Sequence, residues 1–261
     1  MRTAAPKARQ ILVIDVGGTH VKARVTGQRE ERRIVSGPTM TAAGMVRAVK
    51  RLVKDWKYDV VSIGYPGIVI HGRPVHEPHN LGGGWVRFNF AKAFGHPVKM
   101  INDAAMQALG SYKKGHMLFL GFGAGLGSAM IVDGVLEPME LAHLPYKAGK
   151  TYEDYVGDRA LKRLGKKKWR LYVADIVTRL KNALEADYVV LGGGNSKHLK
   201  DLPPGAELGD NRNAFIGGMR LWKEKTKRQV AKKPAPARGS RLETKAAKRA
   251  SGLAATPPPS V

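Results

Sequence analysis

Three apolar segments of the chain run directly into glycines. The segment at 10–16 leads into DVGGTH, the one at 116–122 leads into GFGAGLGS, and the one at 188–194 ends in LGGG. Glycines at the end of a strand let backbone N–H groups approach phosphate oxygens, because no Cβ intervenes. The recurrence therefore predicts strands that end in phosphate-binding turns.

The glycine segments match neither of two common phosphate-binding signatures. A G-x-G-x-x-G motif starting at Gly121 would need glycine at Leu126, and one starting at Gly123 would need it at Ser128. The nearest approach to a P-loop, LPYKAGKT, has Leu144 in place of the first glycine and follows no predicted strand. A dinucleotide-binding fingerprint and a P-loop are both excluded.

Strand and helix patterns alternate along the first half of the chain. Turn residues separate short apolar runs, and residues 41–56 carry apolar side chains at helical spacing. These patterns predict one α/β unit. Its expected strands are 10–16, 20–26, 32–36, 60–64 and 97–101, and its expected helices are 41–56 and 103–113.

The second half repeats this theme. A strand at 116–122 precedes a hairpin with Asp133-Gly134 at its turn, and Thr151 with Asp154 resembles a capping box that opens a helix. The expected helices are 152–164, 168–186 and 211–227, with a strand at 188–194. We therefore predict a duplicated α/β architecture, with one lobe formed by 1–103 plus 211–222, a second by 104–210, and a tail at 223–261.

The chain is strongly basic, with a formal net charge of +24 in 261 residues. From Lys223 onward there are 11 basic and two acidic residues and almost no large apolar side chains. Such a segment is expected to be disordered, and it serves either as a solvated extension or as a polyanion-binding arm. Residues 1–222 are basic too, so we expect attraction to polyphosphate, nucleotides or nucleic acid.

Cysteine is absent, which excludes disulfides, thiolate nucleophiles and cysteine zinc sites. No apolar run approaches the roughly 20 residues that cross a bilayer, and the N-terminal segment lacks a signal sequence. We expect a cytoplasmic protein that does not insert into a membrane.

The ordered set of motifs resembles the ROK family of sugar kinases, within the actin, sugar kinase and heat-shock chaperone superfamily. Over residues 10–222 the motifs are DVGGTHVKA, SIGYPGIV, HNLGGGW, INDAAMQALG, GFGAGLGSAMIVDG, ELAHLPY, TYEDYVG and LGGGNSKHL. Within the family the chain looks most similar to the polyphosphate-dependent glucokinases. The resemblance implies an α/β fold of two ribonuclease-H-like lobes with a cleft between them.

The glycine segments correspond by this resemblance to the phosphate-1, phosphate-2 and adenosine motifs. Asp15 at the edge of the first segment can hold Mg²⁺ or its waters, and the metal would bridge to phosphoryl oxygens. The implied phosphate- and nucleotide-binding residues are Asp15, Gly17, Gly18, Thr19, Lys22, Gly123, Ala124, Gly125, Gly127, Gly192, Gly193 and Gly194.

Phosphorylation of a sugar hydroxyl needs a carboxylate that accepts its proton. Asp103 is the candidate base, although an Asp before a helix is also a common N-cap. The family pattern favours catalysis. The resemblance implies sugar contacts from Asn80, Asn102, Asp103, Glu140, His143 and Glu153.

Two departures from the family pattern bear on this site. In many ROK proteins the equivalent of His143 binds zinc together with three cysteines, and this chain cannot build that site. Ala142 replaces a glycine, which matters for the sugar contacts if the backbone there needs a positive φ. The loop histidines His71, His76 and His79 suit no standard metal site.

The sequence therefore predicts a kinase that transfers a phosphoryl group from polyphosphate, ATP or both to the 6-hydroxyl of glucose or a similar hexose, with Mg²⁺. Homodimers are frequent among similar proteins, so we expect one here. The alternative is a non-catalytic sugar-sensing or nucleic-acid-associated protein whose basic tail binds polyanions.

Overall fold

The computed structural model describes residues 8–223, which lie in one compact unit. The predicted tail falls outside the described residues, apart from its first residue. Because residues up to 223 group together, the predicted boundary between the two lobes stays a prediction. No helix among residues 8–223 is long and apolar enough to span a membrane.

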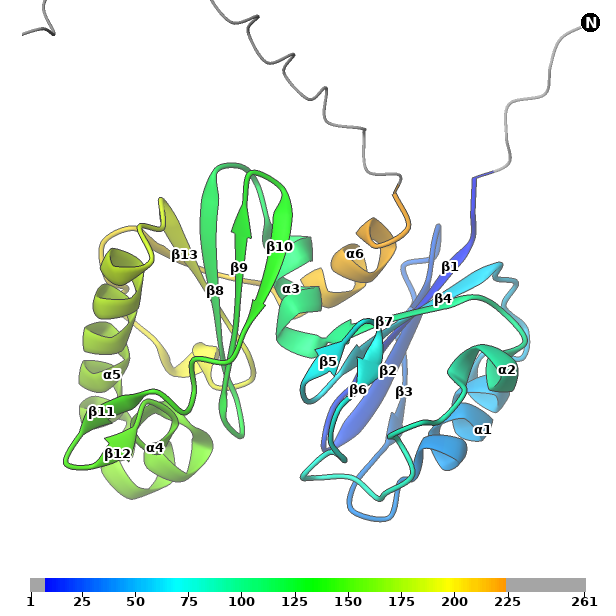
Figure 1. The fold of residues 1–261 in the computed structure, drawn as a ribbon, viewed down its shortest axis with the longest axis horizontal. Helices are drawn as coiled ribbons and strands as arrows, with labels where there is room; N and C mark the ends of the chain where they lie inside the picture. Colours follow the sequence, from blue (N-terminus) through cyan, green and yellow to red (C-terminus); the bar gives the residue numbers. More distant parts are fainter. Residues whose placement is uncertain (1–7, 224–261) are drawn as a thin grey trace, which may run out of the picture. The chain divides into compact units, whose positions relative to one another are not determined.

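The first sheet has five strands in the order β3-β2-β1-β4-β7. Strands β1 to β3 form an antiparallel meander, and β4 and β7 continue the sheet in parallel with β1 (Figure 1). The strands are β1 (Ile11–Val16), β2 (His20–Val25), β3 (Arg32–Val35), β4 (Val60–Tyr65) and β7 (Val98–Asn102). Helices α1 (Ala42–Leu52) and α2 (Phe90–Phe94) accompany this sheet.

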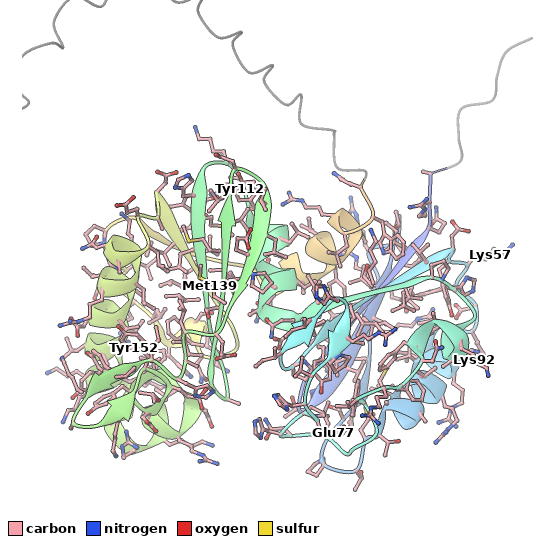
Figure 2. All side chains as sticks on the ribbon, viewed as in Figure 1. Lys57, Glu77, Lys92, Tyr112, Met139 and Tyr152 are labelled. Carbon is pink, nitrogen blue, oxygen red and sulfur yellow. The ribbon has the colours of Figure 1, made fainter. Side chains whose placement is uncertain are left out.

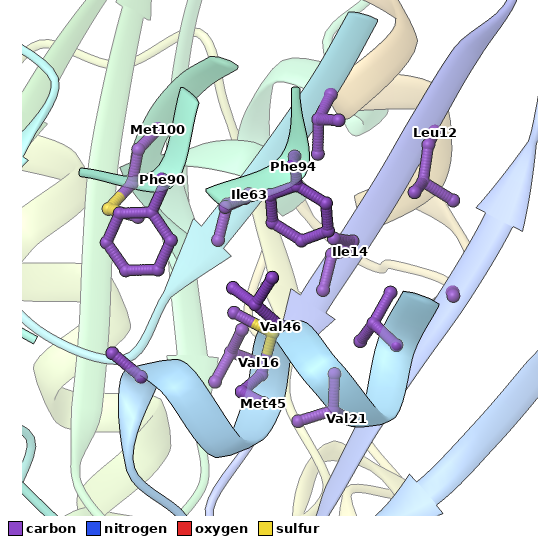
Figure 3. Close-up of a cluster of buried hydrophobic side chains, with 14 of the residues drawn as sticks. Leu12, Ile14, Val16, Val21, Met45, Val46, Ile63, Phe90, Phe94 and Met100 are labelled. Carbon is purple, nitrogen blue, oxygen red and sulfur yellow. The ribbon is translucent and has the colours of Figure 1, made fainter. Parts of the chain in front are cut away.

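Strand β1 is apolar on both faces because both faces are covered. Leu12 and Ile14 join a core cluster that includes Met45 of α1 and Phe94 of α2 (Figure 3). Val13 points to the other face, where Phe215 belongs to its cluster. A strand buried on both sides reads as a continuous apolar run, which is the pattern at the start of the chain.

The second sheet repeats the arrangement with five strands in the order β10-β9-β8-β13-β14. In both sheets the first strand lies in the middle, between the antiparallel meander and the parallel strands. The strands are β8 (His116–Phe122), β9 (Leu126–Val132), β10 (Val135–Met139), β13 (Tyr188–Gly192) and β14 (Ala206–Leu208). This shared order confirms the predicted duplicated α/β architecture.

Helices cover the second sheet as well. Leu118 and Leu120 of β8 share a core cluster with Trp169 of the long helix α5 (Asp158–Ala183). Phe119 belongs to another cluster with residues of α3 (Asp103–Ser111). The remaining elements are β5 (Val69–Ile70), β6 (Arg73–Pro74), β11 (Pro145–Lys147), β12 (Lys150–Thr151), α4 (Glu153–Val156), the 3₁₀ turn η1 (Ser196–His198) and α6 (Asn213–Arg220).

Several predicted helices differ in extent from the observed ones. The helix expected at 41–56 ends at Leu52. Of the helix expected at 211–227, residues 224–227 lie outside the described residues, and the described part is helical over Asn213–Arg220. The helix expected at 152–164 is divided at Gly157, and Gly165 (φ 71°) makes a kink inside α5. Gly157 interrupts a helix that side-chain spacing alone would continue, and the kink at Gly165 falls in the gap predicted between 164 and 168.

The predicted turn and capping signals are each tested by their hydrogen bonds and dihedral angles. Asp133 and Gly134 both have positive φ, as a tight hairpin turn of this kind requires. Asp154 accepts hydrogen bonds from the backbone N–H and the hydroxyl of Thr151, at 2.9 and 3.0 Å. Only half of a capping box is present, because the Thr151 hydroxyl donates to the carboxylate instead of accepting from the helix.

Helices α3 and α6 cross in close contact (Figure 1). A Cβ on Gly110 of α3 would lie 1.8 Å from the carbonyl oxygen of Asn213, and a Cβ on Gly217 of α6 would lie 1.8 Å from that of Met106. Arg220 of α6 also donates to the carbonyl oxygens of Leu109 and Tyr112, at 2.6 and 3.0 Å. The crossing brings backbone against backbone, so neither glycine position accepts a side chain without a shift of the helices.

We expect Gly217→Ala to lower the free energy of unfolding by about 1–3 kcal/mol or more, because the added methyl must push the two helices apart. Urea denaturation followed by circular dichroism measures this change. Gly44→Ala is the matched control: its Cβ meets only the Thr41 hydroxyl, at 3.2 Å, within a helix where alanine is favoured. Equal unfolding midpoints for the two variants would show that the crossing is not tight.

Candidate active site

The first glycine segment forms a tight turn between β1 and β2. The backbone N–H of Gly17 donates to the carbonyl of His20 at 3.0 Å. The Ser36 hydroxyl donates to the carbonyl of Gly17 at 2.6 Å, which ties the turn to the end of β3. A Cβ on Gly18 would lie 3.0 Å from the Cβ of Asn80. The turn therefore holds the loop that carries Asn80 directly against its backbone.

Thr19 and Lys22 flank this turn. Thr19 is exposed, and Lys22 lies opposite Asp15 in the register of β1 and β2. Glu77 supports the neighbouring loop by accepting from the backbone N–H groups of Trp85 and Val86, at 2.9 and 3.1 Å (Figure 2). This loop includes the predicted sugar-contacting residue Asn80, so the Glu77 carboxylate helps to fix the position of that residue.

The second and third glycine segments lie side by side. Gly121 and Gly192 are register partners in the parallel pair β8 and β13. A Cβ on Gly193 (φ 81°) would lie 2.4 Å from the carbonyl oxygen of Phe122, so only glycine fits there. Asn195 closes the arrangement, because its side chain donates to the carbonyl of Gly123 at 3.2 Å.

Helices α4 and α5 begin against the second glycine segment. The backbone N–H of Asp158 donates to the carbonyls of Gly123 and Ala124, at 3.0 and 3.3 Å. A Cβ on Gly125 would lie 2.1 Å from Oε2 of Glu153. Glu153, predicted to contact the sugar, therefore packs against the predicted phosphate-binding segment.

Asp103 is the first residue of α3, at the end of β7. The N-cap is its neighbour Asn102, whose Oδ1 accepts from the backbone N–H of Ala105 at 3.1 Å. The alternative that Asp103 itself caps this helix is thus wrong. The Oδ1 of Asp103 accepts from the backbone N–H of Ala104 at 2.8 Å. No side chain among residues 8–223 forms a hydrogen bond with this carboxylate. Asn102 also donates to the carbonyl of Gly67 at 3.1 Å.

Two acidic side chains from other parts of the chain act on Asp103. Burial raises the pKa of Asp103 to about 7, and the negative charges of Asp15 and Glu140 contribute to the rise. Burial also raises the pKa of Asp15 to about 6, although Lys22 opposes this change. Gly127 lies close to the start of α3, because its Cβ would be 2.7 Å from that of Ala104. The structure thus brings the end of β1, the start of α3 and the β9 end of the second glycine segment together.

The predicted sugar residues Glu140 and His143 are both exposed, with Oε1 and Nε2 separated by 4.0 Å. Ala142 between them is 2% exposed and lies in the core of the second sheet. Its φ is not positive, so alanine is compatible with the backbone here. Within the described part of the chain, no group of three or more potential ligands is arranged to hold a metal ion.

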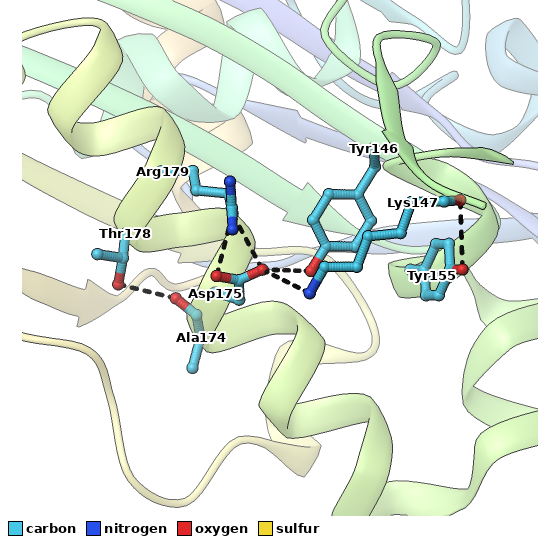
Figure 4. A network of polar contacts seen from close by, with 7 residues as sticks. All are labelled: Tyr146, Lys147, Tyr155, Ala174, Asp175, Thr178 and Arg179. Atoms are coloured by element: carbon cyan, nitrogen blue, oxygen red, sulfur yellow. Dashed lines mark hydrogen bonds and ion pairs between the residues drawn. The ribbon is translucent and has the colours of Figure 1, made fainter. Parts of the chain in front are cut away.

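A polar network anchors the segment that carries Glu140, His143 and Glu153. The Tyr146 hydroxyl donates to Asp175 of α5, which also accepts from Lys147 at 3.2 Å and from Arg179 at 3.0 Å (Figure 4). The Tyr155 hydroxyl donates to the carbonyl of Lys147 at 3.3 Å. These donors lower the pKa of Asp175 to about 2, with the Tyr146 hydrogen bond as the largest cause.

The sequence reasoning missed several residues that position the site. Ser36 holds the first glycine turn, Asn195 joins the second and third segments, and Tyr146 with Asp175 fixes the hairpin of β11 and β12. Asn195 was detectable, since it follows the glycine triplet directly. Ser36 and Asp175 carry no local signal because their partners are distant along the chain.

This arrangement defines an α/β protein with two sheets of the same ribonuclease-H-like order and with glycine turns at their strand ends. Residues 11–137 match the model of the ROK family. The first half of the chain is therefore similar to this family. The chain is 29% identical over 229 residues to a polyphosphate glucokinase of Mycobacterium tuberculosis, which covers 78% of this chain and 83% of that protein.

Solved structures show the same fold. The inorganic polyphosphate/ATP-glucomannokinase from Arthrobacter sp. strain KM superposes with a TM-score of 0.70 at 24% identity, covering 82% of this chain and 98% of that one. A ROK family glucokinase from Streptomyces griseus, in complex with glucose and AMPPNP, gives 0.65 at 17% identity, covering 81% and 98%. The predicted actin-like fold class and the resemblance to this family are confirmed.

The raised pKa values of Asp15 and Asp103 predict how stability depends on pH. Both groups bind protons more tightly in the folded chain than in the unfolded chain. Their contribution to the free energy of unfolding therefore falls as the pH rises from about 4 through about 6 to 7. We expect Asp103→Asn, which cannot ionise, to melt at a higher temperature than the wild type at about pH 8, with the difference shrinking toward about pH 4.

Asp154→Asn is the matched control for this thermal-melting series. The hydrogen bonds from Thr151 lower the pKa of Asp154, so this variant should melt below the wild type at neutral pH. Equal melting temperatures for Asp103→Asn and the wild type at every pH would mean that the surroundings do not disfavour the charged form of Asp103.

Proposed function

We propose that the protein transfers the terminal phosphoryl group of polyphosphate or ATP to the 6-hydroxyl of glucose or a similar hexose. The observation that carries the proposal is the Asp103 carboxylate, half-buried beside Asp15 and near the second glycine segment, with a pKa raised to about 7. The similarity of this chain to a polyphosphate glucokinase of M. tuberculosis supports this choice of acceptor and donor.

Asp103 is proposed to act as the general base. A general base works best when its pKa lies near the working pH. It is then largely deprotonated just above that pH, and it still accepts a proton readily. The hydroxyl proton passes to the Asp103 carboxylate while the hydroxyl oxygen bonds to the terminal phosphorus. The bond from that phosphorus to the bridging oxygen breaks, and the shortened polyphosphate or ADP leaves with the electron pair.

The glycine segments are proposed to hold the donor. Backbone N–H groups at Gly18 and Thr19 and at the second segment would donate to phosphoryl oxygens. Gly17, whose own N–H closes the turn, would complete the binding residues together with Lys22 and the third segment. Asn80, Asn102, Glu140, His143 and Glu153 are proposed to position the sugar. Fixed backbone donors need little reorganisation as charge moves during the transfer.

The residues fit Mg²⁺ bound mainly through the donor. Magnesium prefers oxygen ligands and retains waters, so one or two carboxylates with donor phosphates suffice. Asp15 would hold the ion through its waters, and the ion would supply charge neutralisation at the phosphoryl oxygens. The raised pKa of Asp15 fits this role, because a nearby cation would stabilise its charged form.

The decisive experiment measures sugar phosphate formation from a panel of hexoses with ATP and with polyphosphate. We expect turnover with glucose or a similar hexose, and we expect Asp103→Asn to lower kcat by about 10²–10⁴-fold. Sugar affinity, measured by calorimetry, should change little, because the amide keeps the shape of the side chain. Asp133→Asn at the hairpin turn is the matched control and should keep full activity.

Absence of turnover with every hexose and either donor would overturn the proposal. Loss of sugar binding together with kcat in Asp103→Asn would reduce Asp103 to a binding or structural residue. Size-exclusion chromatography with light scattering on the same samples tests the expected homodimer.

The basic segment from Lys223 onward supports a second candidate function, binding of nucleic acid by a protein with or without catalysis. Its 11 basic residues provide nonspecific affinity for a phosphate backbone. If this is the main function, DNA binding should fall steeply with salt and disappear when the chain is truncated near Lys223. Phosphoryl transfer that persists after truncation would separate the two activities.

A further inference from the structure

A cluster of basic side chains follows the third glycine segment. We call it the basic turn, and it consists of Lys166, Arg170, Lys197 and His198. Lys197 and His198 belong to η1, which begins two residues after Gly194. Lys166 and Arg170 come from α5, just after its kink at Gly165.

Hydrogen bonds fix the basic turn to the glycine segments. Arg170 donates through Nε to the carbonyl of His198 at 2.5 Å, which joins α5 to η1. Ser196 donates to the carbonyl of Gly193 at 2.8 Å. Asn195 bonds to the carbonyl of Gly123, so the second segment, the third segment and the basic turn form one continuous structure.

The lysine and arginine side chains of the basic turn are not neutralised by ion pairs within the described residues. No carboxylate of residues 8–223 forms an ion pair with Lys166, Arg170 or Lys197. The pKa of His198 is lowered by burial and then by the charges of these three side chains. Like charges held together repel one another, so an anionic ligand at this position would relieve the repulsion.

The chemistry of the two donors differs at this point of the chain. A nucleotide presents its phosphates to the glycine segments and then continues as an uncharged ribose and base. A polyphosphate continues as phosphates, each of which carries negative charge. Cations beyond the third glycine segment therefore suit a donor that remains charged along its length.

We propose that the basic turn is a binding subsite for the inner phosphates of a polyphosphate chain whose terminal phosphoryl group lies at the glycine segments. This inference rests on the proposed kinase function. It assigns Lys166 and Lys197 to donor selection, with Arg170 as the residue that positions the turn through the His198 carbonyl.

The test uses the full-length chain with Lys166→Gln and Lys197→Gln combined. Initial rates are measured with long-chain polyphosphate, with short-chain polyphosphate and with ATP, over a series of salt concentrations. We expect the KM for long-chain polyphosphate to rise by roughly tenfold, and the slope of log KM against log salt to fall by about 1 for each lysine. The KM for ATP should stay within about twofold of the wild type, because each removed charge lies beyond its phosphates.

The matched control combines Lys54→Gln and Lys57→Gln, which removes the same charge from another surface. Both lysines follow the end of α1, and Figure 2 shows Lys57 on the opposite side of the described unit from α5. They also form no ion pair with a carboxylate of residues 8–223. We expect the control to keep the wild-type KM for all three donors.

The outcomes separate this inference from the function on which it rests. A wild type that makes no sugar phosphate from any donor contradicts the kinase proposal. A wild type that uses polyphosphate, with a Lys166/Lys197 variant of unchanged KM, overturns the subsite alone. An equal loss in the control variant assigns the effect to overall charge, and an equal loss with ATP assigns it to the general donor site. Unchanged kinetics with weakened DNA binding would assign the basic turn to nucleic acid.

Discussion

The close crossing of α3 and α6 is the contact on which the rest of the structure depends. Helix α3 begins with the candidate base Asp103 and packs its Ala104 side against β9, while α6 packs on β1. Because Gly110 and Gly217 allow backbone to approach backbone, α3 is held from both sides. The position of one carboxylate relative to the glycine segments of both sheets is therefore set by the packing of these two helices.

The site itself is costly to the fold. Burial of Asp15 and Asp103 near each other raises the pKa of both groups, which means that the charged forms are disfavoured in the folded chain. The basic turn adds repulsion between like charges at the other end of the proposed donor path. Residues chosen for stability alone would avoid both arrangements. Their presence together fits a phosphate donor whose bound metal ion meets the carboxylates and whose negative phosphates meet the basic turn.

The sequence predicts the strands and turns well because their signals are local. Apolar runs ending in glycine mark β1, β8 and β13, and Asp133-Gly134 marks a hairpin. The sequence predicts some helix ends less well: the helix expected at 41–56 ends at Leu52, although apolar side chains continue at helical spacing to Trp56. It also cannot show that Asp15 and Asp103 approach each other, since that contact arises only when β1 and α3 are packed.

The division of roles between two adjacent residues explains how one helix start can serve both structure and chemistry. A helix N-terminus has unpaired N–H groups, and an acidic side chain there often caps the helix by accepting a hydrogen bond from one of them. Here Asn102 provides the cap, so the Asp103 carboxylate accepts from the N–H of Ala104 and from no side chain of residues 8–223. Its remaining acceptor capacity stays available for a proton. Because the preceding residue caps the helix, the carboxylate of the candidate base does not have to do so.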